Sequence, residues 1–158
     1  MHSIHQFKVQ GIEGNEIDFA QFAGKKIIIV NVASECGYTP QYQQLQELYD
    51  EFQDKLVIVG FPSDDFGGQE PGTNEEIQAF CEIRYGVRFP LSAKITIKGT
   101  SVHPVYQWLT QKSQNGVADS EVRWNFYKYL LDENGQLVKS FPSGVSPLDE
   151  QILDWLQS

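Results

Sequence analysis

The chain has 158 residues, 41% of them hydrophobic, and a formal net charge of −9. This length is typical of one domain with its own core, so we expect a single domain over residues 1–158. The acidic balance disfavours nucleic acid and anionic membrane surfaces as partners, because both require a basic patch. No apolar stretch is long enough to cross a bilayer, which predicts no stable membrane insertion.

The N-terminal segment, residues 1–7, lacks a basic start followed by an apolar run. We therefore expect no signal peptide and a cytoplasmic location. The only two cysteines, Cys36 and Cys81, are too few for a disulfide scaffold, which a chain of this size does not need. No histidine stands at a ligand-like spacing from either cysteine, so no metal site is predicted.

Hydrophobic periodicity and turn residues predict an alternation of strands and helices. In chain order, the predicted elements are a hairpin of strands over 7–12 and 16–19, a buried strand over 25–32, a helix over 40–52, a buried strand over 56–61, a Pro/Gly-rich loop over 62–72, a helix capped by Thr73 and running to about 84, a strand over 89–97, a helix from 103 through 109, a polar loop over 111–121, strands over 126–132 and 136–141, and a helix over 147–156. This order predicts an α/β fold with a central mixed sheet, helices on both faces and an N-terminal β-hairpin.

Cys36 lies in the turn between the first buried strand and the first long helix. Thr39 is the expected N-cap of that helix, and Pro40 suits its first position, where an N–H would be unpaired anyway. Unpaired backbone N–H groups and the positive end of the helix dipole favour a thiolate at such a place. The turn is therefore typical of a reactive cysteine, although a buried structural cysteine is the alternative.

A reactive cysteine before the first long helix, followed at the chain's end by two strands and a helix, is the thioredoxin-like arrangement. Tyr38 and Thr39 follow Cys36-Gly37, so there is no C-x-x-C motif. The sequence therefore does not predict a plain dithiol exchanger.

Three uncharged residues elsewhere offer N–H donors that suit a thiolate. Gln69 lies in the Pro/Gly-rich loop, and Trp124-Asn125 stands just before a predicted strand. Such donors would stabilise a thiolate and hold a peroxide in line with the sulfur. Taken alone, these residues favour a structural interpretation, a core tryptophan and turn amides, over a functional one. Glu35 would disfavour a thiolate if it pointed inward, so we expect it to face solvent.

The sequence resembles the glutathione peroxidase family over nearly its whole length, from about Phe7 to the C-terminus. Three segments carry the resemblance, in the family's order and spacing: 31–39 around Cys36, 60–62 with 66–72 around Gln69, and 124–126. The resemblance implies a thioredoxin-like fold and a peroxidase activity. It further implies that Cys36 is the peroxidatic cysteine and that Gln69, Trp124 and Asn125 complete the catalytic tetrad.

The chain departs from the family's pattern in two places. Ser63-Asp64-Asp65 stands where many relatives have Cys-Asn-Gln, which makes the loop more acidic. The segment 98–124 is too short for the assembly loop of tetrameric animal members, which favours a monomer. The arginines are also scattered, with no cluster that would hold glutathione.

Cys81 lies near the end of the predicted helix that starts after Thr73, on a face that it shares with Ile77. The structural interpretation is that Cys81 acts only as a small buried hydrophobic residue. The resemblance instead places Cys81 at the resolving position of the thioredoxin-dependent, two-cysteine, non-selenium branch. Cys36 sulfenic acid would then condense with Cys81, and thioredoxin would reduce the resulting disulfide, with no bound cofactor.

Two alternatives stay open at this point. A glutathione-dependent peroxidase would leave Cys81 without a catalytic role. A peroxide-sensing thiol switch would pass its disulfide to a partner protein. The substrates in the leading hypothesis are hydrogen peroxide and organic or lipid hydroperoxides.

Overall fold

The computed structural model describes residues 2–158. Met1 lies outside the described residues. It is the first residue of the predicted domain and of the N-terminal segment in which no signal peptide is expected. Its elements are β1 (Lys8–Gln10), β2 (Glu16–Asp18), β3 (Lys26–Val32), α1 (Gln41–Glu51), β4 (Leu56–Pro62), α2 (Asn74–Tyr85), α3 (Pro104–Thr110), α4 (Lys112–Asn115), β5 (Lys128–Leu131), β6 (Leu137–Phe141) and α5 (Glu150–Gln157), with short 3-10 helices at Ile4–Gln6 and Phe19–Phe22. Within the described residues, no helix is long and apolar enough to span a bilayer.

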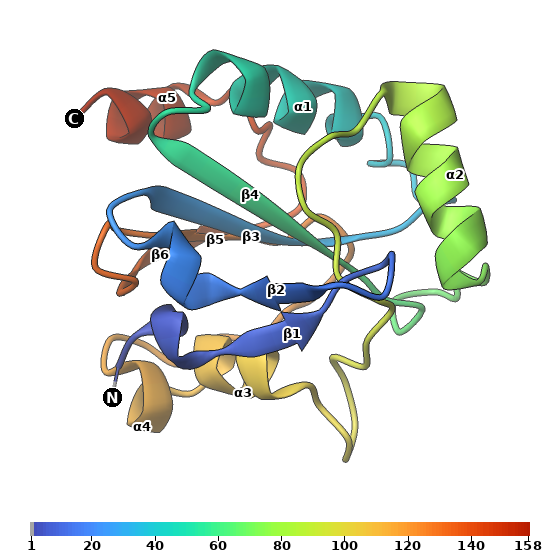
Figure 1. Ribbon diagram of the computed structural model, residues 1–158. Helices are drawn as coiled ribbons and strands as arrows, with labels where there is room; N and C mark the ends of the chain where they lie inside the picture. Colours follow the sequence, from blue (N-terminus) through green and yellow to red (C-terminus); the bar gives the residue numbers. More distant parts are fainter. Residues whose placement is uncertain (1) are drawn as a thin grey trace.

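The central sheet has four strands in the order β4-β3-β5-β6, and β1 and β2 form a separate antiparallel hairpin (Figure 1). β3 pairs with β4 in parallel and with β5 antiparallel, and β6 pairs antiparallel with β5. The predicted mixed sheet with a late antiparallel pair is therefore confirmed. Val32 pairs with Pro62, and Val30 pairs with Lys128. The ends of β3 and β4 and the start of β5 consequently lie at one edge of the sheet.

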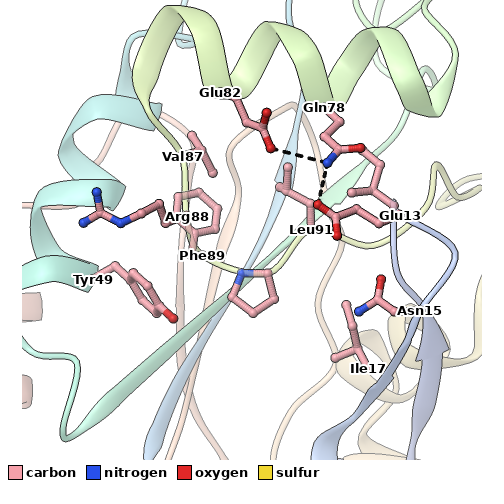
Figure 2. A pocket seen from close by; sticks show the side chains of 12 residues that line it. Glu13, Asn15, Ile17, Tyr49, Gln78, Glu82, Val87, Arg88, Phe89 and Leu91 are labelled. Carbon is pink, nitrogen blue, oxygen red and sulfur yellow. Dashed lines mark hydrogen bonds between the residues drawn. The ribbon is translucent and has the colours of Figure 1, made fainter.

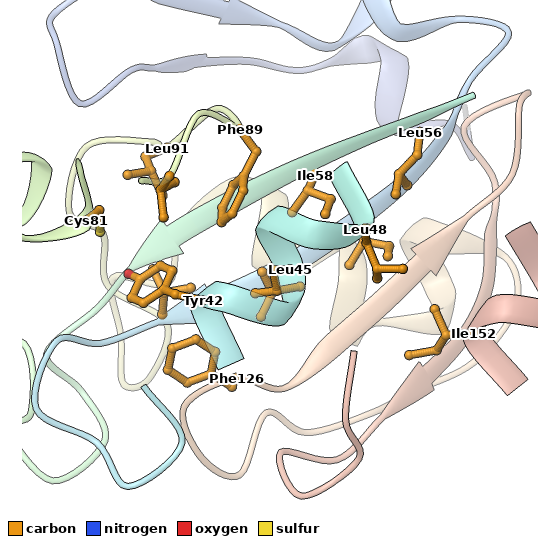
Figure 3. Packing of buried hydrophobic residues seen from close by; sticks show 14 of the residues in the cluster. Tyr42, Leu45, Leu48, Leu56, Ile58, Cys81, Phe89, Leu91, Phe126 and Ile152 are labelled. Carbon is orange, nitrogen blue, oxygen red and sulfur yellow. The ribbon is translucent and has the colours of Figure 1, made fainter. Parts of the chain in front are cut away.

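The two faces of the sheet bury separate cores, as the alternation of side chains along β3 requires. Ile28, Val30 and Val32 pack with α1, α2 and α5 on one face. Figure 3 shows Leu45 and Leu48 of α1 beside Ile58 of β4 in this core. Ile27 and Ile29 pack on the other face against the hairpin and α3. Both cysteines belong to the first of these cores.

α2 starts as the sequence predicts. The Thr73 side chain accepts the Glu76 N–H, and the Glu76 side chain accepts the Thr73 N–H, which completes a capping box. Gly86 ends the helix in the left-handed conformation, with φ of 60°. Only Ile77 and Cys81 of this helix are buried, so α2 attaches to the core by a narrow stripe.

The predicted strand over 89–97 is wrong. This segment lies beside β4 and the hairpin but makes only isolated bridges, Leu91 to Gly60 and Ser92 to Gly11. The Pro90 carbonyl accepts the Gly60 N–H. Pro90 has no N–H of its own to donate to β4, so a continuous ladder of hydrogen bonds cannot pass through it.

The segment 111–121 is not wholly a loop, because residues 112–115 form the short helix α4. The side chain of Asn115 organises this region by donating to the carbonyls of Trp108, Leu109 and Ala118. The last helix begins at Glu150 rather than 147, since Asp149 is its N-cap and its side chain accepts the Gln151 N–H.

Candidate active site

The turn that carries Cys36 leaves the carboxyl end of β3 and is held by its own side chains. The Cys36 N–H donates to Thr39 Oγ1 at 2.9 Å, and that hydroxyl donates to the Ala33 carbonyl at 2.8 Å. The Tyr38 N–H donates to the Cys36 sulfur at 3.3 Å. The sulfur therefore sits in a rigid turn and accepts a backbone hydrogen bond, which stabilises negative charge on it.

Thr39 is not the N-cap of α1, contrary to the prediction. Its hydroxyl is already engaged by Cys36 and Ala33, and Pro40 occupies the N-cap position with no side-chain cap. Cys36 is thus held by the turn itself rather than by the first turn of the helix. Cys36 is 7% exposed, while Glu35 faces solvent as expected.

Asn31 of β3 ties the 124–126 turn to the strand that carries Cys36. Its buried side chain donates to the Trp124 carbonyl at 3.0 Å and accepts the Tyr127 N–H at 3.0 Å. The Asn31 carbonyl accepts the Phe126 N–H at 2.6 Å. Phe126 has a φ of 65°, a strained value for an aromatic residue, so the surrounding contacts impose this turn.

Gln69 and Asn125 are in direct contact, as the predicted site requires. Asn125 Nδ2 donates to Gln69 Oε1 at 3.0 Å and to the Phe66 carbonyl at 3.2 Å. The Gln69 carbonyl accepts the N–H of Glu35 at 3.0 Å, directly before the cysteine. Because Asn125 occupies the Gln69 oxygen, the NH₂ group of Gln69 is the end left to donate to another acceptor.

Trp124 packs over the loop that holds Gln69. Its ring meets Phe66 edge-on with centroids 6.3 Å apart, and a Cβ on Gly67 would come within 2.7 Å of it. Within residues 2–158, Tyr38 supplies the one hydrogen bond to the Cys36 sulfur, and neither Gln69 nor the Trp124 indole donates to it. The structure thus gathers the loops of the four predicted residues, while the catalytic roles of these residues stay a prediction.

The two aspartates at positions 64 and 65, where the chain departs from the family's pattern, accept hydrogen bonds from backbone N–H groups. Asp64 Oδ1 accepts the Glu70 N–H at 2.9 Å, and Asp65 Oδ2 accepts the N–H groups of Ile97 and Lys98. Asp64 therefore connects the start of the loop of Gln69 to its end, and Asp65 connects the loop to the segment 97–98. Each satisfies backbone donors that would otherwise be unpaired.

Cys81 is fully buried in α2, and both thiols are free. Burial raises the pKa of the Cys81 thiol to about 12, and the hydroxyl of Tyr42 opposes part of this rise. The two side chains lie near each other in the core (Figure 3). At neutral pH Cys81 is therefore a protonated, shielded thiol, which is unreactive as it stands.

The sequence interpretation missed Lys128, a fully buried lysine next to the 124–126 turn. Its Nζ donates to the carbonyls of Phe126 at 2.7 Å and Ser143 at 3.2 Å. Gln41 at the start of α1 donates to the same Ser143 carbonyl at 2.8 Å. Burial lowers the pKa of Lys128 to about 7. A lysine inside a run predicted as a strand was the signal available in the sequence.

The interpretation also missed Glu70, which is buried beside Ser34 although it lies in a loop. Within the described chain, no cluster of three or more His, Cys, Asp or Glu residues could hold a metal ion. The chemistry that these side chains support is thiol chemistry at Cys36, assisted by amides and backbone N–H groups.

Comparisons with known proteins agree with this geometry. The sequence model of the family described as glutathione peroxidase matches residues 4–110, more than half of the chain. The glutathione peroxidase-like peroxiredoxin 2 of Saccharomyces cerevisiae is 43% identical over 95% of this chain and 94% of its own length. The hydroperoxy fatty acid reductase of Synechocystis is 42% identical over 97% of this chain and 94% of its own length.

Solved structures give the same result for the fold. The crystal structure of Trgpx in its apo form superposes with a TM-score of 0.74 and 31% identity, over 99% of this chain and 96% of that chain. A thiol:disulfide interchange protein of the thioredoxin family from Chlorobium tepidum superposes with a TM-score of 0.67 and 14% identity, over 96% and 93% of the two chains. The predicted thioredoxin-like fold is confirmed. The chain belongs to the glutathione peroxidase family and is a peroxidase of that family, an oxidoreductase acting on peroxides.

Proposed function

We propose that the protein is a thiol peroxidase that reduces hydrogen peroxide and organic or lipid hydroperoxides through Cys36. The thiolate attacks one peroxide oxygen, the O–O bond breaks, and the leaving alkoxide or hydroxide takes a proton. Cys36 becomes a sulfenic acid. The observation that carries this proposal is the Asn125–Gln69 hydrogen bond, together with the backbone bond from Glu35 to Gln69.

These bonds matter because they place an uncharged donor beside the cysteine turn. With its oxygen held by Asn125, Gln69 can present its NH₂ group to the sulfur or to a peroxide oxygen. A fixed donor of this kind stabilises charge as it develops and needs no reorganisation during the reaction. Asn125 acts in this scheme through Gln69, and Trp124 covers the same loop and supplies an indole N–H.

In the second step Cys81 resolves the sulfenic acid to a Cys36–Cys81 disulfide. A disulfide requires Cα atoms within about 7 Å, and a thiol buried in a helix must first leave its place. The narrow attachment of α2 favours such a movement. Besides its two buried residues, α2 is held by three contacts near its surface. Gln78 donates to Glu13 of the hairpin (Figure 2), Asn74 accepts the Lys94 N–H at 2.8 Å, and the ring of Tyr85 lies 5.6 Å from that of Tyr42.

The reductant in this proposal is thioredoxin, which reduces the disulfide by exchange. The arginines support it over glutathione, because they are engaged elsewhere. Arg88 pairs with Asp50, Arg123 lies 3.6 Å from Glu121, and Arg84 stacks over Phe80. Lipid hydroperoxides are included because the Synechocystis relative is named for the reduction of hydroperoxy fatty acids.

Steady-state turnover of peroxide with thioredoxin or with glutathione tests this proposal. We expect turnover with thioredoxin in the unaltered protein, none in Cys36→Ser, and a loss of thioredoxin-dependent turnover in Cys81→Ser. Mass spectrometry after one equivalent of peroxide should find a Cys36–Cys81 bridge. Full thioredoxin-dependent activity in Cys81→Ser would contradict the resolving role, and turnover with glutathione alone would favour the one-cysteine alternative.

A further inference from the structure

Glu70 is a buried carboxyl group whose position the peroxide step does not explain. The residue is 1% exposed, and neither of its carboxyl oxygens has a hydrogen-bond partner among the described residues. An unpaired buried polar group typically costs about 1–3 kcal/mol, and more when it is charged. A group of this kind in a native core calls for an explanation, and a catalytic role is one of the kinds that apply.

Glu70 stands between the turn of Cys36 and the helix of Cys81. A cavity of about 380 Å³ separates the turn from α2, and its lining includes Ser34, Glu35, Glu70, Glu76, Ile77 and Phe80. The backbone fixes Glu70 there, because its N–H donates to Asp64 and the neighbouring Gln69 carbonyl accepts from Glu35. Residues of the Cys36 turn and residues of α2, the helix that carries Cys81, therefore meet Glu70 at one cavity.

The resolving step needs a proton acceptor at that place. Cys81 attacks as a thiolate, yet burial keeps it a thiol at neutral pH. The hydroxide that leaves the Cys36 sulfenic acid needs a proton in turn. Tyr42 also faces Cys81, but burial raises the pKa of its hydroxyl well above the ordinary value, so it is no base.

We propose that Glu70 is the general base of disulfide formation, accepting the Cys81 thiol proton and passing it to the oxygen that leaves Cys36. In this step the S–H bond of Cys81 and the S–O bond of Cys36 break, and an S–S bond and one water molecule form. The proton moves from sulfur to the carboxylate and then to the departing hydroxide, so the carboxylate is regenerated. No further oxidant or reductant is needed. This inference rests on the proposed resolving role of Cys81.

The surroundings of Glu70 tune it for this task. Burial raises the pKa of its carboxyl to about 7, the nearby Asp64 adds to the rise, and Ser34 and Lys94 oppose it. Neither the hydroxyl nor the N–H of Ser34 reaches full hydrogen-bond geometry with the carboxyl oxygens. The exposed Glu76 of α2 lines the same cavity, while Cys81 of α2 and Tyr42 of α1 lie outside its lining but close enough for the charge of Glu70 to raise the pKa of each. A base whose pKa lies near the working pH is the most effective kind.

The test separates the two chemical steps after one equivalent of hydrogen peroxide. Trapping of the sulfenic acid measures Cys36 oxidation, and mass spectrometry of quenched samples measures Cys36–Cys81 disulfide formation. We expect Glu70→Gln to leave the first rate within about twofold and to slow the second at least ~10-fold, the low end of base catalysis. The second rate should rise with pH through about 7 in the unaltered protein and stay flat in Glu70→Gln.

Two further variants make the result specific. Glu70→Asp keeps a carboxylate and should restore the pH dependence at a lower rate. Glu75→Gln removes an exposed carboxylate from the same helix and should behave like the unaltered protein. An unchanged or faster disulfide rate in Glu70→Gln, or an equal loss in both steps, would overturn the assignment. If the unaltered protein forms no bridge, it is the resolving role of Cys81 that fails.

Discussion

Replacing Lys128 with methionine tests whether a buried ammonium group holds the site together. Methionine keeps most of the volume but removes the donor to the carbonyls of Phe126 and Ser143. The Phe126 carbonyl then loses its donor, at about 1–3 kcal/mol, while the Ser143 carbonyl keeps its bond from Gln41. Against this loss, the variant no longer buries a charge, so the net effect depends on pH.

The sign follows from the pKa of Lys128, which lies at about 7 in the folded chain against an ordinary 10.5. Between these values the unfolded chain binds more protons, so the free energy of unfolding rises with pH. At about 1.4 kcal/mol per pKa unit, Lys128 contributes a rise of about 2 kcal/mol between pH 7 and pH 9. Lys128→Met lacks this contribution.

Urea unfolding at pH 7 and pH 9 measures the effect as a difference of differences, in which all other titrating groups cancel. We expect methionine to cost about 2 kcal/mol more at pH 9 than at pH 7, relative to the unaltered protein. An equal cost at both pH values would show that Lys128 is charged alike in the folded and unfolded chains, which would refute the reasoning.

Three further predictions concern the loops around Cys36. Asn125→Ala removes the hydrogen bond that holds the Gln69 side chain. It should slow Cys36 oxidation at least ~10-fold in stopped-flow measurements, because one fixed donor contributes roughly 10²–10³ in rate. An unchanged rate would show that Asn125 has no part in this step. Gly67→Ala should cost about 1–3 kcal/mol and shift the tryptophan fluorescence, because the new Cβ meets Trp124 in a left-handed turn. Gly99→Ala is its control, with the same backbone penalty and open space, so equal effects would exclude the Trp124 contact. Thr73→Ala should cost about 1 kcal/mol in thermal unfolding and speed disulfide formation, because it loosens the cap of α2; a slower step would mean that α2 must stay intact.

The sequence was most informative where local chemistry and packing agree. The β-branched run before Cys36 favours a buried strand, and the Thr73–Glu76 pair favours the start of a helix, so both were predictable. The segment 89–97 failed for the opposite reason. Its apolar alternation fits a strand, but Pro90 has no N–H to donate to a ladder. The backbone of this segment therefore bonds to β4 and to the hairpin through isolated hydrogen bonds.

The site shows the same division. The resemblance pointed to Gln69 and Asn125, and their hydrogen bond is present. Glu70 and Lys128 could not be found in this way, because burial is a property of the folded chain. A glutamate in a glycine-rich loop and a lysine in a polar-looking strand end are ordinarily solvated.

The position of the site in the sheet also bears on synthesis in the cell. Cys36 follows β3, Gln69 follows β4 and Asn125 precedes β5, and these three strands are neighbours. A growing chain therefore contains Cys36 long before the residues that complete its surroundings are made. Until residues near 131 have been added, β3 lacks its antiparallel neighbour and Asn31 lacks the 124–126 turn, so the site assembles only after most of the chain has been made.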